Sequence, residues 1–420
     1  MWDVIHLDHN ATTCPSDAVC NAVAEAMRQC WHNPSSIHRA GQHAKAKVEL
    51  ARRAVAELIG AKPSEIVFAA SGSEAIAMCV RGLVERESDP VTAVLSSETE
   101  HSAMRGCLKS LEGRGLIRWV RLPVDRRGVV TPEAIAEALD SLPKGERALV
   151  SVQWANNETG VIQPIEQIAS VAKERGAFVF TDATQWVGKM PADVRTLGVD
   201  LLTCAPHKFN GPKGVGIIWI RRGPKLSPLV PGTQELGRRA GTENTPGIVG
   251  AGVAAREAAN WLSDPENLKR SEALRDKLEQ ALLERIPGAR VNGVGPGAGR
   301  GAQGAGTEQN NNHPAPGAQR PAPRVWSTSN MTLPGVLAEA LVIVLSERGV
   351  MISAGSACGS GSIEPSAALM AMGLCREEAE CSIRLSIGKE TTEAEIDEAI
   401  EKIVTTALEI GAKCGQNATA

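Results

Sequence analysis

The 420-residue chain contains no tyrosine and only four phenylalanines, although it has eight tryptophans, and we have no physical account of this imbalance. Its 45 lysine and arginine residues nearly balance 48 aspartate and glutamate residues, so it lacks the basic excess of a nucleic-acid-binding protein. No apolar run reaches the roughly 18 residues of a membrane-spanning helix, and no basic start of a signal peptide is readable. We therefore expect a cytoplasmic globular protein without a nucleic-acid or membrane partner.

The ten cysteines are scattered, and no Cys-x-x-Cys pair or Cys/His cluster suggests a metal site. A chain of this length buries enough surface to fold without disulfides or a metal. Most of the thiols are therefore expected to be buried, with one or two reactive. At about 150 residues per domain, the length predicts two to three domains.

Short β-rich runs alternate with helical patterns between residues 15 and 260, which predicts an α/β domain with a mostly parallel sheet covered on both faces. The clearest helical period lies in Gly41–Ile59, and further helical patterns follow Ser73, His101, Pro132 and Pro164. The strand candidates are Glu65–Ala69, Thr92–Leu95, Ile117–Leu122, Ala148–Val152, Ala177–Thr181, Val199–Thr203 and Val215–Ile220.

The character of the chain changes after residue 260. A long helical stretch, Asn267–Arg285, leads to a strand–helix section that closes with Glu393–Ile410. We expect residues 261–420, joined by residues 1–14, to form a smaller α+β domain. In the segment 295–323, 18 of 29 residues are Gly, Pro or Ala and no other hydrophobic residue occurs, which predicts a disordered surface insertion.

Two residues in the large domain suggest cofactor chemistry. Asp182 ends an apolar strand, where a buried carboxylate suits a protonated ring nitrogen such as that of pyridoxal phosphate (PLP). Lys208 follows the next strand, and a lysine among apolar walls can form a Schiff base. A helix cap and a solvated loop charge are the ordinary interpretations of each residue alone, but the pair together with the following motifs favours a site.

Three further motifs follow strands. The small residues of AASGSEA, at 69–75, follow a strand, and Ser73 with Glu74 opens a helix, which gives a candidate phosphate cradle, although an ordinary helix cap has the same pattern. His101 could stack on a cofactor and move protons, although a lone histidine is more often structural. ANNETG, at 155–160, offers amide groups to a polar ligand, or simply a turn.

Two motifs lie in the second domain. In SAGSACGSGS, at 353–362, Cys358 has no apolar neighbours to bury it, so a mobile loop could bring its thiolate to a bound intermediate. Arg384 lies within an apolar strand, CSIRLSIG, and a buried arginine requires an anion. A substrate carboxylate would match its planar guanidinium, and an internal salt bridge is the alternative.

Taken together, the chain resembles the cysteine desulfurases of the nitrogen-fixation and housekeeping class, among the class-V, fold-type I PLP-dependent enzymes. The resemblance spans nearly the whole chain outside the insertion. It is carried by HLDHNATT (6–13), NPSSIHRAG (33–41), ANNETGVIQPI, HKFNGPKGVG, GTENTPGIVGAG, GSACGSGSIEPS and IRLSIGKETTEAEID (383–397).

The resemblance implies a role for each candidate residue around PLP. Lys208 would bind PLP as a Schiff base and shuttle the α-proton, and Asp182 would pair with the pyridine nitrogen. Gln185 would hydrogen-bond the phenolate oxygen of the ring. His101 would stack on the ring and assist proton transfer.

The remaining roles concern the phosphate, the substrate and the sulfur. Gly72, Ser73 and His207 would hold the phosphate, with Thr242 contributed by the other subunit of a homodimer. Asn157 would contact the cofactor and, with Arg384, bind the carboxylate of L-cysteine. The thiolate of Cys358 would take the sulfur as a persulfide, releasing L-alanine, and an iron–sulfur scaffold or another acceptor protein would receive it.

Three departures distinguish the chain from this family: Ala205 replaces a common serine before Pro206, Ala77 replaces a common asparagine, and the insertion precedes the Cys358 loop. The first two remove polar contacts to PLP, so we expect an active enzyme that holds PLP more loosely. A selenocysteine lyase, another class-V PLP enzyme, and a catalytically impaired sulfur-carrier subunit are the alternatives.

Overall fold

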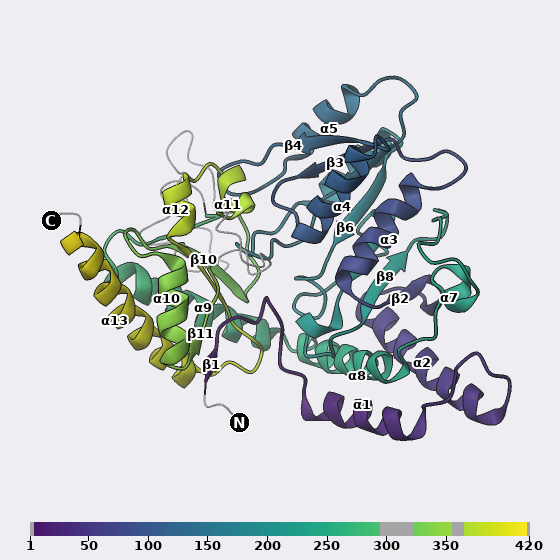
Figure 1. The fold of residues 1–420 in the computed structure, drawn as a ribbon, viewed down its shortest axis with the longest axis horizontal. Coiled ribbons are helices and arrows are strands. Elements are labelled where there is room, and N and C mark those ends of the chain that lie inside the picture. The colour runs from purple at the N-terminus through teal and green to yellow at the C-terminus, as the bar shows by residue number, and fades with distance from the viewer. Residues whose placement is uncertain (1–3, 295–321, 355–364, 418–420) are drawn as a thin grey trace.

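The computed structural model describes the backbone of residues 4–294, 322–354 and 365–417, with side chains described as far as residue 412 (Figure 1). Two sheet-containing units lie side by side, one built mainly from the first 260 residues and the other from the C-terminal part. Among the described residues, no helix is both long and apolar enough to cross a membrane. The domain boundaries expected at residues 14/15 and 260/261 remain a prediction.

The larger unit contains a seven-stranded sheet with the order β2-β8-β7-β6-β5-β3-β4. β8 runs antiparallel to both neighbours, and the other strands pair in parallel. The sheet is therefore mostly parallel, as the sequence predicted. Each observed strand end lies within two residues of its predicted position. The strands are β2 (Ile66–Ala69), β3 (Ala93–Ser97), β4 (Arg118–Leu122), β5 (Ala148–Ser151), β6 (Phe178–Asp182), β7 (Leu201–Cys204) and β8 (Gly216–Ile220).

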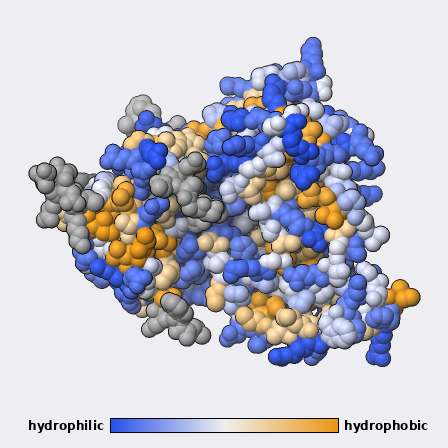
Figure 2. Space-filling model, in the orientation of Figure 1, coloured by the Kyte–Doolittle hydropathy of each residue, from blue (hydrophilic) through white to orange (hydrophobic). Residues whose placement is uncertain are grey.

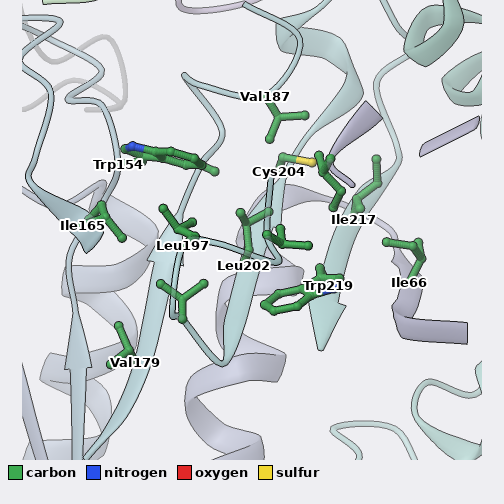
Figure 3. Close-up of a cluster of buried hydrophobic side chains, with 14 of the residues drawn as sticks. Ile66, Trp154, Ile165, Val179, Val187, Leu197, Leu202, Cys204, Ile217 and Trp219 are labelled. Atoms are coloured by element: carbon green, nitrogen blue, oxygen red, sulfur yellow. The ribbon is translucent and has the colours of Figure 1, made fainter. Parts of the chain in front are cut away.

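Helices cover both faces of this sheet, which is why its strands are apolar on both sides. Phe180 and its equivalents on neighbouring strands pack toward α3 and α4, whereas Val179 packs with α2, α5, α6 and α8. Figure 3 shows part of the core that contains Val179, where strand side chains meet Trp154 and Ile165. The helices are α2 (Arg39–Leu58), α3 (Gly72–Val84), α4 (Ser102–Gly113), α5 (Pro132–Asp140), α6 (Ile165–Glu174) and α8 (Thr245–Leu262), with α1 (Asp17–Gln29) beside α8.

The smaller unit has its own core around an antiparallel sheet of order β12-β10-β9 and a parallel pair, β1 and β11. Because β1 pairs with β11, the N-terminal segment belongs to this core. Its elements are β1 (Ile5–His6), α9 (Pro265–Arg285), β9 (Arg290–Val291), β10 (Thr328–Thr332), α10 (Ala338–Glu347), β11 (Val350–Met351), α11 (Ala367–Ala371), α12 (Arg376–Glu380), β12 (Ser382–Ser386) and α13 (Glu393–Asn417).

The insertion predicted at 295–323 is two residues too long at its C-terminal end. Ala322 is buried, and the carbonyl of Pro323 accepts a hydrogen bond from Ile162 N at 2.9 Å. Packing against the large unit therefore holds these two residues, which composition alone assigned to the insertion. Residues 295–321 lie outside the described part of the chain.

One face of the smaller unit exposes apolar side chains. Ile343 on α10 and Leu408 on α13 are both exposed, and Leu337 lies just before α10. Figure 2 shows hydrophobic colour gathered over these helices.

Candidate active site

The polar residues predicted from sequence meet at the carboxyl edge of the parallel strands. β6 ends at Asp182, and β7 leads directly into a 3₁₀ turn, Pro206–Lys208. Because β6 and β7 are parallel neighbours, both chain segments leave the sheet at the same edge. In open α/β sheets, ligands bind at this edge.

The amine of Lys208 lies against the N-terminal segment. Its Nζ donates to the carbonyls of Asn10 at 2.5 Å and Ala11 at 2.8 Å. Asn210, two residues later, has a φ of 63°, in the left-handed region that asparagine tolerates. Its amide donates to Cys14 O, so this turn and the N-terminal segment are tied together around the lysine.

Asp182 is a buried carboxylate without a cationic partner. Its side chain is nearly inaccessible, and Oδ1 accepts from the backbone N–H of Thr184 at 3.0 Å. Among the described residues Oδ2 has no hydrogen-bond partner and no lysine or arginine forms an ion pair with it. Burial raises the pKa of the Cys204 thiol, and the charge of Asp182 raises it further. Such a carboxylate favours a positively charged group beside it.

Gln185 lies in a buried network with the N-terminal segment and a second lysine. Its Nε2 donates to Asn10 O at 3.0 Å, and its Oε1 accepts from Lys189 Nζ at 2.7 Å. Lys189 also donates to Asn10 Oδ1 at 2.9 Å. Asn10 therefore contacts Gln185, Lys189 and Lys208 at once.

Both predicted histidines lie at the site. His101 is the N-cap of α4, and its Nδ1 accepts from Ala103 N at 3.1 Å, so Nε2 is the nitrogen left to carry a proton in the neutral ring. The Nδ1 of His207 lies 3.2 Å from Thr12 Oγ1. Burial lowers the pKa of His207 to about 4, with a further contribution from Lys208.

The helix of the candidate phosphate cradle begins one residue earlier than the sequence indicated. α3 begins at Gly72, and the cap is Ser71, whose hydroxyl accepts from Glu74 N at 3.0 Å. Ser73 is exposed in the first turn. A Cβ on Gly72 would stand 3.4 Å from the Cβ of Ala205. A serine at position 205, common in the family, would therefore place its hydroxyl at the cradle.

Glycine at position 216 is required for the cradle to form. A Cβ there would overlap the backbone carbonyl of Ser71, so only glycine lets β8 pass beneath the start of α3. The backbone N–H groups of this first turn and the helix dipole together form an anion site. The phosphate cradle at AASGSEA stays a prediction, for which this geometry leaves room.

The structure corrects the predicted environment of Arg384. Its guanidinium is buried and pairs with Asp8, Nη2 to Oδ1 at 2.6 Å, and it also donates to the carbonyl of Asn157 at 3.2 Å. Nε has no partner among the described residues. The internal salt bridge considered as the alternative is therefore present, and Nε is the donor that remains for a ligand.

In ANNETG, the two asparagines differ. The amide of Asn156 is used within the fold, because Oδ1 accepts from the backbone of Glu158 and Nδ2 donates to Thr99 O. Asn157 contributes its backbone carbonyl to Asn10 and Arg384, and its half-buried side chain has no hydrogen bond among the described residues. Only Asn157 is available to a ligand.

Two predicted residues are not tested by this chain alone. Thr242 is exposed in the loop before α8, and Arg239 of the same loop pairs with Glu74 of α3, Nε to Oε1 at 2.8 Å. The contact predicted for Thr242 is with the other subunit of a homodimer. Cys358 lies outside the described residues.

Sequence reasoning missed four residues that hold the site together, namely Asp8, Asn10, Glu100 and Lys189. The first two belong to HLDHNATT, whose density of polar residues after a short strand was the available signal. Glu100 precedes His101, and burial raises its pKa to about 8. Nothing in QWVGKM distinguishes Lys189 from a surface lysine.

Comparison with known proteins places this site in a family. A model described as aminotransferase class-V matches residues 5–299 and 311–399. Cysteine desulfurase 2 of Trichormus variabilis is 39% identical over 399 residues, which span 95% of this chain and 92% of that protein. Cysteine desulfurase NifS of Azotobacter vinelandii is 36% identical over 401 residues, covering 95% and 91%.

Solved structures agree with the sequence matches. A NifS-like protein superposes with a TM-score of 0.81 at 32% identity, covering 96% of this chain and 98% of its own. SspA in complex with cysteine superposes with a TM-score of 0.74 at 27% identity, covering 92% and 99%. The fold is therefore the fold-type I architecture of PLP-dependent enzymes. The chain belongs to the class-V aminotransferase family and, within it, to the cysteine desulfurases.

Proposed function

We propose that this protein is a PLP-dependent enzyme that converts L-cysteine to L-alanine and passes the sulfur to its own Cys358. The observation that carries the proposal is that Lys208 and Asp182 lie at the same edge of the sheet. The Nζ of the lysine donates to the backbone carbonyls of Asn10 and Ala11, and the carboxylate has no cationic partner among the described residues. The likeness to the solved structure of SspA in complex with cysteine supports the choice of substrate.

The residues present fit PLP. The free oxygen of the buried Asp182 suits a protonated ring nitrogen, and the start of α3 at Gly72 and Ser73, with His207 nearby, suits a phosphate. Gln185 offers an amide N–H to the ring oxygen, and His101 would lie against the ring. When bound, PLP supplies an electron sink for charge that develops on the carbon atoms of an amino acid.

The protein's own groups then bind the substrate and move its protons. Arg384 retains Nε as a donor, and with the side chain of Asn157 it would orient the substrate carboxylate. The amine of Lys208, half-buried and held by two carbonyls, would take and return the proton at the α-carbon. His101, whose Nδ1 is fixed by the start of α4, presents Nε2 for a second proton transfer.

Cys358 would perform the sulfur transfer. Its thiolate attacks the substrate sulfur, the carbon–sulfur bond breaks, and the electron pair of that bond stays on carbon, which takes a proton. The products are L-alanine and a persulfide on Cys358, so atoms and electrons balance without an external oxidant. The flanking glycines and serines of GSACGSGS support a loop that carries this thiol to the substrate.

We further propose that the enzyme is a homodimer in which Thr242 reaches the phosphate of the partner, and that an iron–sulfur scaffold or another acceptor protein receives the persulfide sulfur. The exposed loop of Thr242 and its anchor, the Arg239–Glu74 ion pair at α3, support the first part. Sedimentation of the parent and Thr242→Ala proteins, with PLP affinity measured in parallel, tests the subunit contact.

The experiment that tests the function compares three variants after PLP is added. Lys208→Ala should lose the visible absorption band of the bound cofactor. Cys358→Ser should keep the band but lose most alanine formation, whereas Cys20→Ser, a change of an exposed thiol on α1, should behave as the parent. Alanine formation by Cys358→Ser at the parent rate would contradict the assigned nucleophile.

A further inference from the structure

We infer that Lys189 is a positioning residue that fixes the amide of Gln185 with its N–H group facing the cofactor site. The inference rests on the proposed function only for the identity of the cofactor, because the contacts that carry it belong to the protein alone. Lys189 lies in the segment between β6 and β7, one helical turn after Gln185.

Lys189 is buried, with 4% of its surface exposed. It forms no ion pair with a carboxylate among the described residues, and its Nζ donates to two amide oxygens, Gln185 Oε1 at 2.7 Å and Asn10 Oδ1 at 2.9 Å. Burial lowers its pKa well below the ordinary value, and the nearby Lys208 and Arg384 lower it further. Both hydrogen bonds persist whether the group is an ammonium or an amine, because either form has at least two N–H donors.

These contacts decide which end of the Gln185 amide is which. A glutamine amide has an acceptor oxygen and a donor nitrogen of similar shape, so its orientation depends on its partners. Because the ammonium form of Lys189 has no lone pair and can only donate, the oxygen points toward it and Nε2 points away. In the structure Nε2 donates to Asn10 O, the same carbonyl that accepts from Lys208.

Asn10 is fixed in turn by the smaller unit. Its Nδ2 donates to Thr328 Oγ1 on β10 at 2.8 Å and to Asn157 O at 3.1 Å, and its backbone N–H donates to Ser386 Oγ on β12 at 2.9 Å. With Nδ2 used in this way, Oδ1 is left to accept from Lys189. The orientation of Gln185 is therefore set by a chain of contacts that begins in the smaller unit.

An ordinary structural role does not explain this lysine. Lys173 in the same unit is paired with the carboxylate of Asp200, as expected for a lysine that serves only the fold. Lys189 instead loses its hydration without gaining a carboxylate, which is unfavourable for stability. A group that costs stability and orders a cofactor-binding amide is typical of a functional site.

A double-mutant cycle of Lys189→Met and Gln185→Ala tests the inference. The readouts are the dissociation constant of PLP, the position of the visible band of bound PLP, and the thermal unfolding of the protein without PLP. Lys173→Met is the matched control, because it removes a lysine that contacts no site residue. Lys189→Gln is the second variant and retains one donor group if the methionine variant folds poorly.

We expect Lys189→Met to weaken PLP binding by about tenfold, the typical effect of one misplaced hydrogen bond, and to shift the band. In the Gln185→Ala background the same change should have little further effect on PLP binding or on the band, and Lys173→Met should alter neither PLP binding nor the position of the band. An undiminished effect of Lys189→Met in the Gln185→Ala background, or parent-like binding in the single variant, would overturn the inference. If the parent binds no PLP, the proposed function fails, whereas non-additive unfolding temperatures in the apo proteins still test the contact.

Discussion

Two buried aspartates on neighbouring strands have opposite environments. Asp200, at the amino end of β7, is fully buried and accepts from Lys173, Arg221 and the backbone N–H of Val179. Asp182, at the carboxyl end of β6, accepts one backbone hydrogen bond and has no cationic partner among the described residues. At the amino edge of the sheet Asp200 is paired with cations of the fold, whereas at the carboxyl edge Asp182 is not paired with a cation among the described residues.

The difference separates structural charge from functional charge. A buried carboxylate that serves stability is paired, because an unpaired one is costly. At the carboxyl edge, neither Asp182 nor Lys189 has a counter-charge among the described residues, which is what a site prepared for a charged ligand requires. In the proposed function, the ring nitrogen of the cofactor would be the partner of Asp182.

The largest expected effect comes from Asp182→Asn. This substitution preserves shape but removes the negative charge that would face the cofactor ring nitrogen. We expect alanine formation from L-cysteine to fall by about 10²–10³-fold, the typical loss when one electrostatic contact to a reacting group is removed. Steady-state rates with saturating PLP measure the effect, and near-parent rates would show that Asp182 serves only the fold.

Asp200→Asn is the counterpart at the other edge. It leaves Lys173 and Arg221 without their partner, so the free energy of unfolding should fall by about 3 kcal/mol, at the low end for a broken buried pair because both cations are partly exposed and can rehydrate. Urea titration measures this loss. The visible band of bound PLP should stay where it is in the parent. A shifted band would contradict a purely structural role for Asp200.

Acid should destabilise the carboxyl edge through its neutral histidines. Burial lowers the pKa of His9 to about 3 and that of His207 to about 4, whereas both titrate near 6.5 when unfolded. At a pH between the folded and the unfolded pKa of each histidine, only the unfolded chain binds the proton of that ring. Stability is therefore complete above pH about 6.5 and falls with decreasing pH, by up to about 1.4 kcal/mol per pH unit for each group.

Urea titrations between pH 7 and 4 measure that slope. His9→Gln should reduce it, and replacement of the exposed His43 with asparagine should leave it unchanged. The same slope in His9→Gln as in the parent would contradict a neutral buried ring at position 9.

The smallest expected effect is a gain. Ala205→Ser restores a hydroxyl beside Gly72 at the start of α3. One hydrogen bond to a charged phosphate is worth about 1.5–3 kcal/mol, so PLP should bind at least about tenfold more tightly. Equilibrium dialysis of PLP measures the gain. Weaker binding would mean that the added hydroxyl finds no phosphate and is merely buried.

Most of the fold could be predicted from the sequence because its sheet strands are apolar on both faces and separated by amphipathic helices. The helices that were not predicted include α1 and α8. In α8, glycines at 250 and 252 suggest a loop, but a Cβ at either position would overlap Val23 or Ala51. These glycines let three helices approach closely, a tertiary effect that local propensity does not contain.

The site could be predicted where a residue follows a strand, as Asp182, Lys208 and His101 do. Asn10 and Lys189 could not, because their roles arise from contacts between segments more than 170 residues apart. Arg384 was correctly expected to be buried, but its partner Asp8 comes from the other end of the chain. Motif spacing shows which residues reach the sheet edge and not which ones hold them there.

The most direct test of the central claim is the product balance of the purified protein with PLP, L-cysteine and a thiol reductant. Desulfuration predicts equal amounts of L-alanine and sulfide, because each turnover moves one sulfur to Cys358 and the reductant then releases it. Pyruvate in place of alanine would identify β-elimination by a different PLP enzyme. No turnover with PLP bound would contradict the account and support a sulfur-carrier subunit.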